Sequence, residues 1–205
     1  MNKKSDIKSE KNAQEIKTAL SREEIKLRSF FDLFKSIDIE DISESVFNLI
    51  IEDHAVLTAG NPSHFNSMLA NWKWGILFHK PVVYSFINPK RYTLELMRKE
   101  QKFTLSYFNC EFQDDILLFG KMSARHHEEK MKNTKLTSIQ TPTGNMAFKE
   151  AKLIIECDLV HFTDVPPDFL FKNENKKFAA NACLSDTNDY HNIVYGAITN
   201  VWSQP

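Results

Sequence analysis

Residues 58–75 read T-A-G-N-P-S-H-F-N-S-M-L-A-N-W-K-W-G, and this stretch is the most informative part of the sequence for the fold. Gly60-Asn61-Pro62 favours a turn after an apolar strand at residues 54–59. The strand that follows this turn mixes small residues with aromatic residues. Small side chains allow a flat ligand ring to lie against the main chain, where N–H groups can bond to its heteroatoms. The stretch therefore predicts a turn leading into a strand that can contact a planar ligand.

A second stretch, residues 87–93, reads I-N-P-K-R-Y-T at an expected junction between a strand and a helix. A helix N-terminus that carries Arg91 and Thr93 suits an anion, because main-chain N–H groups and a guanidinium both point at it. The alternative is an ordinary helix cap with a surface charge. Together the two stretches predict a site for a flat ring beside an anionic group.

Further strands and helices surround these two stretches. From apolar runs and turn residues, strands are expected at residues 54–59, 67–78, 82–87, 103–108, 151–162 and 191–202. From helical spacing of apolar residues, helices are expected at 25–37, from 41 to 50, at 92–99, 114–122 and 128–133. Because the strands are irregularly spaced with helices inserted, a mainly antiparallel barrel fits better than regular βαβ units.

The composition excludes several classes of protein. The formal net charge is -1, so nothing suggests electrostatic capture of nucleic acid or of an acidic membrane. Three scattered cysteines, Cys110, Cys157 and Cys183, argue against a disulfide framework or a zinc site, and each is expected to be a small buried residue. With no signal-peptide core and no apolar run long enough to span a bilayer, we expect a soluble, cytoplasmic protein.

Several common catalytic and binding motifs are missing from the sequence. There is no G-x-G-x-x-G, no G-x-x-x-x-G-K-[ST] and no G-x-S-x-G, and the chain has only five glycines. Rossmann, P-loop and nucleophile-elbow sites are therefore not expected. The run His126-His127-Glu128-Glu129 contains metal-ligand residue types, but consecutive helical residues point in different directions. We interpret the run as a solvated face and predict no metal site.

Five passages between residues 34 and 202, in order and spacing, resemble the flavin reductase-like FMN-binding family. Residues 42–60 resemble its first helix and strand, and residues 61–75 its N-x-x-x-x-N-x-M-T-A-S-W signature. Residues 87–93 are similar to its R-P-x-R-Y-T motif. Residues 123–130, followed by Leu136, stand where the family has S-G-R-D-x-D-K, and residues 191–198 resemble its last strand, H-x-x-x-x-G-E-V.

The resemblance implies a mainly β fold, an FMN-binding split β-barrel that is antiparallel and Greek-key-like, with flanking α-helices. It implies a homodimer with flavin mononucleotide (FMN) near the subunit interface, in a domain at residues 34–205. The composition predicts a charged, helical extension at residues 1–33, whose first 22 residues are either disordered or a solvated helix, and which lies outside the resemblance. The residues that it places at the flavin ring are Ser67, Met68, Leu69, Ala70 and Asn71. Those that it places at the phosphate are Arg91, Tyr92, Thr93, Ser123 and Lys130. His191 would stand where substrate or nicotinamide approaches; the alternative is an ordinary strand histidine.

The sequence departs from the family pattern mainly at the flavin ring. Leu69 replaces a threonine and so removes a hydroxyl that could bond to the ring. Asn71 replaces a serine, Lys73 stands where the family has small glycines, Ala124 replaces a glycine and Ala197 a glutamate. The phosphate-side motif is nearly intact.

The resemblance leads to three hypotheses for function. The first is a flavin oxidoreductase that takes a hydride from NADH or NADPH at flavin N5 and passes electrons to free flavin, a partner protein or a small molecule. The second is a flavoprotein without enzymatic activity that serves electron transfer or flavin storage. The third is a barrel that has lost its flavin. Bound flavin separates the first two from the third, and oxidation of the nicotinamide separates the first from the second.

Overall fold

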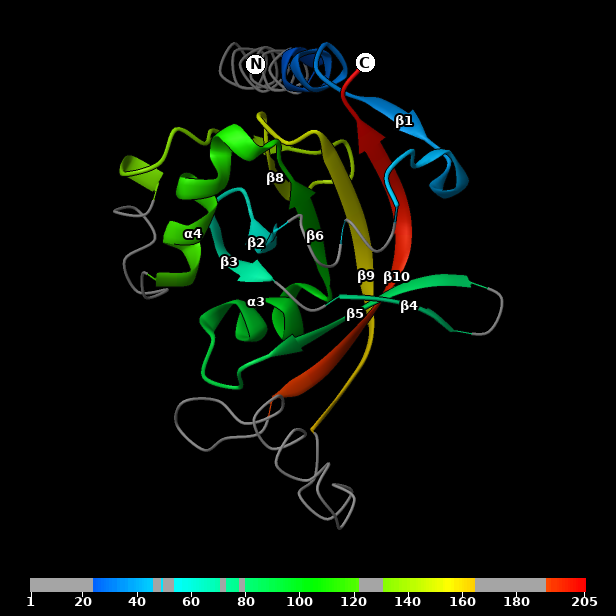
Figure 1. The fold of residues 1–205 in the computed structure, drawn as a ribbon, viewed down its shortest axis with the longest axis vertical. Helices are drawn as coiled ribbons and strands as arrows, with labels where there is room; N and C mark the ends of the chain where they lie inside the picture. The colour runs from blue at the N-terminus through cyan, green and yellow to red at the C-terminus, as the bar shows by residue number, and fades with distance from the viewer. Residues whose placement is uncertain are drawn as a thin grey trace, which may run out of the picture.

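One curved antiparallel sheet dominates the computed structural model (Figure 1). The structure describes residues 24–45, 49, 54–70, 73–77, 80–121, 131–164 and 191–205. The strands of this sheet are β1 (Lys35–Ile37), β2 (Ala55–Asn61), β3 (His64–Ala70), β4 (Lys73–Leu77), β5 (Lys80–Ile87), β6 (Lys102–Tyr107), β9 (Leu153–Asp164) and β10 (Asn192–Ser203). A small second sheet pairs β7 (Ser138–Gln140) with β8 (Met146–Phe148).

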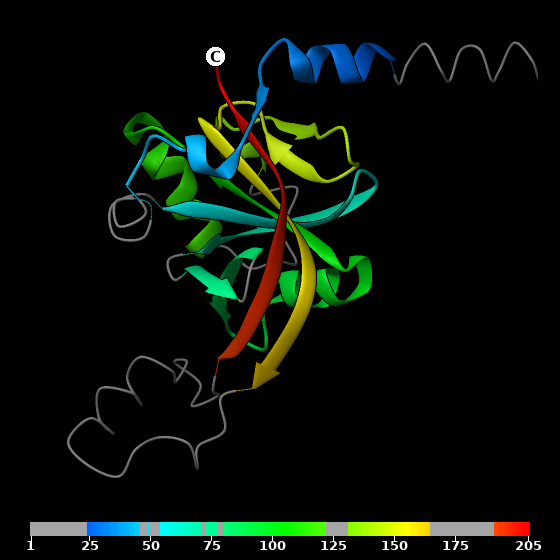
Figure 2. The same ribbon diagram turned by 90° about the vertical axis from the view of Figure 1, so that its right-hand side faces the viewer.

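The helices are short and cover the sheet (Figure 1). In the part of the chain that the structure describes, α3 (Tyr92–Glu100) and α4 (Gln113–Lys121) are α-helices, and η1 (Ile39–Asp41) and η2 (Cys110–Phe112) are 3-10 helices. A further helix at residues 24–31 precedes β1 and lies across the C-terminal end of β10 (Figure 2). In the described residues, no helix is long and apolar enough to cross a membrane.

The strand order of the large sheet is β3-β2-β6-β9-β10-β5-β4, with β1 paired to β10 off this path. Every pairing is antiparallel, and β10 lies between β9 and β5 with β1 beside its last residues. The order therefore ends in β3 on one side and β4 on the other. Within the described residues no strand pairing joins these two ends, so closure into a split barrel stays a prediction.

Two hydrophobic clusters form the core, because α3 and α4 cover different parts of the sheet. The first joins the buried side of α3, including Leu94 and Met97, to inward residues of the strands such as Leu57 and Ile155. The second lies under α4 and includes Phe119, Phe148, Phe30 and Trp202. Phe30 belongs to the stretch expected to be an extension, yet it is fully buried, with its ring edge against Trp202.

Most elements expected from the sequence are confirmed, with four corrections. Residues 67–78 are expected as one strand, but residues 67–70 end β3 and residues 73–77 form β4, which lies at the other end of the strand order. The expected helix at 25–37 ends at residue 31, and residues 35–37 are strand β1, because they pair with residues 201–203 of β10. The short strands β7 and β8 were not expected. Of the expected helix at 41–50, residue 41 ends η1, residues 42–45 are not helical and residue 49 is helical, so the prediction is wrong for its first turn. Of the expected helix at 128–133, residues 131 and 132 are helical and residue 133 is in a turn. The remaining residues of both lie outside the described residues.

The cysteines differ in their surroundings. Cys157 is buried, as expected, and burial raises the pKa of its thiol well above its usual value. Cys110 is exposed, so its expected burial is wrong: it begins the 3-10 helix η2 instead of joining the apolar face of a neighbouring element. Cys183 lies outside the described residues.

Gly196 is required where β10 crosses the core. A Cβ on this residue would lie 2.6 Å from Cε1 of Phe103 and 2.9 Å from Cβ of Cys157. Both neighbours are fully buried, and in a close-packed core they cannot shift without disturbing other side chains. We expect Gly196→Ala to lower the free energy of unfolding by about 1–3 kcal/mol, the usual cost of overpacking a core. Urea denaturation measures this change.

Gly120 of α4 is the matched control. A Cβ there would lie 3.1 Å from Cδ2 and 3.5 Å from Cβ of Leu69, a contact that a small movement of the leucine methyl group relieves. Alanine also gains about 0.8–1 kcal/mol of helix propensity over glycine. Gly120→Ala is therefore expected to leave stability unchanged or to raise it. Equal loss of stability in both variants would contradict the packing argument at Gly196.

Candidate functional site

Residues 88–91 form a tight turn that begins helix α3. The main-chain N–H of Arg91 donates to the carbonyl of Asn88 at 2.9 Å, and the N–H of Lys90 donates to Oδ1 of Asn88 at 2.9 Å. Proline at position 89 presets the backbone for such a turn. The chain then enters the helix at Tyr92, and Arg91 is the residue that precedes its first turn.

Among the described residues, no side chain caps the N-terminus of α3. Arg91 makes no capping hydrogen bond, and its guanidinium forms no ion pair with any residue that the structure describes. The first main-chain N–H groups of a helix have no partners within the helix, and they carry the positive end of its dipole. An unpaired cation beside such groups forms a site that can hold a phosphate.

Strand β3 lies beside the start of α3 and is bonded to it through side chains. Nε2 of His64 lies 2.6 Å from the hydroxyl of Tyr92, and Nδ2 of Asn66 donates to Oγ1 of Thr93 at 2.7 Å. These contacts bring the predicted ring-side strand and the predicted phosphate-side motif together, as Figure 1 shows for the two elements. The two stretches singled out from the sequence are therefore neighbours in the fold.

The predicted ring-side residues have mostly buried side chains. Met68 and Ala70 join the core cluster under α3, and the hydroxyl of Ser67 lies 2.9 Å from that of Thr58. Leu69 packs among the residues under α4, next to Gly120. Contact with a flavin ring would therefore use the main chain of β3, the strand that ends the order of the described strands. Asn71 lies outside the described residues.

His191 is placed at the same end of the sheet as the turn at residues 88–91. It directly precedes β10, whose first residue Asn192 lies opposite Ile87, the last residue of β5. His191 is half-buried and already has an interaction within the protein. Ser123, Lys130 and the run at 126–129 lie outside the described residues. Within the part of the chain that is described, no cluster of side chains is placed to hold a metal ion.

Three residues of the site were not singled out from the sequence: Asn61, His64 and Asn66. Nδ2 of Asn61 donates to Oε1 of Glu100 at 3.0 Å, and its Oδ1 accepts from the main-chain N–H groups of Ser63 and His64, each at 3.1 Å. Both asparagines belong to the N-x-x-x-x-N part of the quoted signature. Their spacing was the available signal, because two polar residues at a fixed separation on a hairpin can both face one helix.

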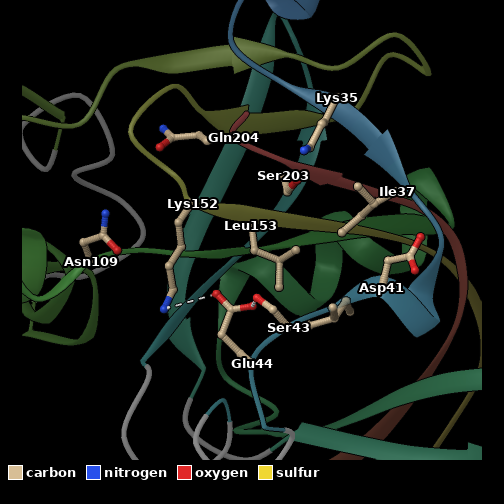
Figure 3. Close-up of a pocket in the computed structure, with 11 residues that line it drawn as sticks. Lys35, Ile37, Asp41, Ser43, Glu44, Asn109, Lys152, Leu153, Ser203 and Gln204 are labelled. Carbon is tan, nitrogen blue, oxygen red and sulfur yellow. Dashed lines mark hydrogen bonds and ion pairs between the residues drawn. The ribbon is translucent and has the colours of Figure 1, made fainter.

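A polar cavity of about 540 Å³ lies at the opposite end of β10 from His191 (Figure 3). Residues of β1, of the segment after η1 and of the adjoining ends of β9 and β10 line it. Nζ of Lys152 lies 3.7 Å from Oε1 of Glu44 within it. None of the described residues predicted to bind flavin lines this cavity, which lies apart from the start of α3 and from β3.

Comparison with known proteins points to one family. A family model described as "Flavin reductase like domain" matches residues 49–205. An uncharacterized protein of Aeropyrum pernix is 26% identical over 122 residues, a match that covers 59% of this chain and 46% of that protein. The chain thus spans about half the length of this curated relative.

Solved structures share the fold at low sequence identity. An FMN-binding protein from Thermus thermophilus is 18% identical, with a TM-score of 0.57 over 83% of this chain and 82% of that one. A flavoredoxin from Methanosarcina acetivorans is 15% identical, with a TM-score of 0.57 over 83% and 76%. An NADH:FAD oxidoreductase of Streptomyces globisporus is 13% identical, with a TM-score of 0.53 over 75% and 76%.

Proposed function

Because this chain belongs to the flavin reductase like domain family, we propose that it binds FMN between strand β3 and the start of helix α3. The observation that carries the proposal is the uncapped helix N-terminus, where Arg91 has no ion-pair partner in the described residues. A dianionic phosphate fits this place, because it supplies the acceptors and the negative charge that the helix end and the guanidinium lack.

The residues present divide the proposed site into two ends. Arg91 and Tyr92 would hold the phosphate, with Ser123 and Lys130 as further contacts predicted from the resemblance. Thr93, also predicted there, is 0% exposed and its hydroxyl accepts from Asn66, so it would act from behind the helix start. The main chain from Ser67 to Asn71 lies along the ring. In this arrangement Leu69 contributes its main chain alone, since its side chain packs beside Gly120. The replacement of the family threonine therefore removes one hydroxyl without placing a bulky group over the ring.

We further propose that the protein is an NAD(P)H-dependent flavin oxidoreductase. Bound FMN would supply hydride and electron transfer, and the protein supplies position and electrostatics. The start of β10 lies beside the end of β5, so His191 stands near the turn that leads to the phosphate end. Its proposed role is to orient an incoming nicotinamide or substrate by hydrogen bonding.

Anaerobic addition of NADH or NADPH to the protein loaded with FMN tests this activity. Loss of the flavin absorbance near its visible maximum is the result expected of a reductase. A loaded protein that either nicotinamide leaves fully oxidised would contradict the reductase proposal, and would favour the alternative of electron transfer or flavin storage.

The proposed homodimer would use the outward face of β5 and β10. Inward residues such as Val83 and Val194 are fully buried, so the alternating residues point outward and form an apolar face. Tyr84 lies opposite Tyr195 in this face, with its ring 6.2 Å from that of Phe86. Tyr84 is 36% exposed. Exposed aromatic patches of this kind are typical of protein–protein contacts.

Tyr84→Glu is expected to convert the dimer to a monomer, because it would bury two like charges near one another in a two-fold interface. Light scattering after gel filtration measures the mass. Ile25→Glu is the control, since Ile25 is 65% exposed on the N-terminal helix and lies outside the proposed face. A dimer that persists in the Tyr84 variant would exclude this face as the interface.

A further inference from the structure

We propose that Asn66 is a positioning residue, which holds the ring-side strand β3 and the phosphate-side helix α3 together as one binding surface for FMN. This inference rests on the proposed function. It concerns a residue that does not need to touch the ligand. It acts through Thr93, the second residue of α3.

The contact between Asn66 and Thr93 is short and buried. Nδ2 of Asn66 donates to Oγ1 of Thr93 at 2.7 Å, and the two side chains are 2% and 0% exposed. Away from water, a hydrogen bond is stronger and its geometry is better defined than at the surface. The bond therefore fixes the distance between the middle of β3 and the first turn of α3.

Asn66 is a poor choice for stability alone. Its Oδ1 is buried and has no hydrogen-bond partner among the described residues, and leaving a buried acceptor unpaired costs folding free energy. The residues that face the same way on β3, Met68 and Ala70, are apolar and belong to the core. An apolar residue at position 66 would join that cluster without an unpaired polar atom. A role in the site accounts for the asparagine better than a role in packing does.

A ligand that engages both β3 and α3 depends on the distance between them, whereas a ligand that engages β3 alone does not. FMN has both the ring and the phosphate. Riboflavin has the ring and lacks the phosphate. Loss of the hydrogen bond between Asn66 and Thr93 should therefore lower the affinity for FMN more than that for riboflavin. The gain from binding at two linked points depends on the distance between them.

The experiment compares the Kd values of FMN and riboflavin, measured by quenching of flavin fluorescence, in the full-length wild type and variants. Asn66→Ala is expected to raise the Kd of FMN about 10-fold or more and the Kd of riboflavin less than about threefold. Glu100→Ala is the matched control, because it removes the bond from Asn61 that ties the same hairpin to the far end of α3. It is expected to leave the FMN-to-riboflavin ratio of the wild type unchanged.

Variants of Thr93 test whether Asn66 acts through this bond. Because Asn66 acts through Thr93, Asn66→Ala combined with Thr93→Val is expected to give the same FMN-to-riboflavin ratio of Kd values as Thr93→Val alone. An Asn66→Ala protein that melts at a lower temperature and keeps the wild-type ratio would overturn the positioning role. Wild-type protein that binds neither flavin would overturn the proposed function, and the inference with it.

Discussion

Replacing Glu156 with alanine is expected to lower the free energy of unfolding by at least about 3 kcal/mol, as measured by chemical denaturation. Glu156 is fully buried in β9 and accepts hydrogen bonds on both carboxylate oxygens. Oε2 accepts from Nε1 of Trp202 at 3.0 Å. Oε1 accepts from the hydroxyls of Thr141 and Thr143 and from Nδ2 of Asn145.

The size of this effect follows from what alanine would leave behind. Four donors would lose their acceptor inside the protein, and each unsatisfied buried group costs about 1–3 kcal/mol. The turn at residues 141–145 would also lose its link to β9, and the indole of Trp202 anchors the cluster that contains Phe30.

Glu156→Gln provides the companion measurement, because it keeps the volume and one of the two oxygens. An intermediate loss of stability is expected, since the new amide group places a donor against existing donors. A free energy of unfolding of Glu156→Ala within about 1 kcal/mol of the wild-type value would contradict the expected loss. It would mean that Glu156 and its four donors are not a main determinant of stability.

Arg91→Ala is expected to weaken FMN binding by about 1.5–3 kcal/mol, or about 10- to 150-fold in Kd, because phosphate oxygens lose a charged donor. Riboflavin, which has no phosphate, is expected to bind the variant as it binds the wild type. Fluorescence titration with both flavins measures the difference.

Arg98→Ala is the control for loss of positive charge on the same helix. Arg98 lies in the last turn of α3, with its guanidinium 4.3 Å from the centre of the Phe162 ring. Salt screens charges that are separated by the length of a helix, so its removal is expected to change FMN affinity by less than about threefold. Unchanged FMN affinity in Arg91→Ala would remove the phosphate assignment.

The long elements of the fold could be predicted from local sequence, and the short ones could not. Strand β9 and helix α3 have strong apolar patterns, and the structure has them close to the expected residues. Residues 35–37 continue a helical pattern, yet they form β1, because pairing with β10 outweighs local preference. β7 and β8 have three residues each, too few for an alternating pattern to be visible.

The site could be predicted in part. The turn at residues 88–91 and Arg91 could be predicted, because proline favours a turn and an arginine just before a helix favours an anion, whatever the rest of the chain does. The sequence did not lead to Asn66 or Glu156, whose roles depend on partners 27 and 15 residues away, respectively. For Glu156 the available signal was a single charged residue inside an apolar run, I-I-E-C, since buried charges need several partners.

The visible absorbance spectrum of the purified protein, recorded after incubation with FMN and passage through a desalting column, tests flavin binding most directly. The proposed site at β3 and α3 predicts that flavin bands are retained by the protein, and that they are lost or reduced in Arg91→Ala. A colourless wild-type protein that cannot be loaded with FMN would contradict the account, and would mean that the barrel has lost its flavin.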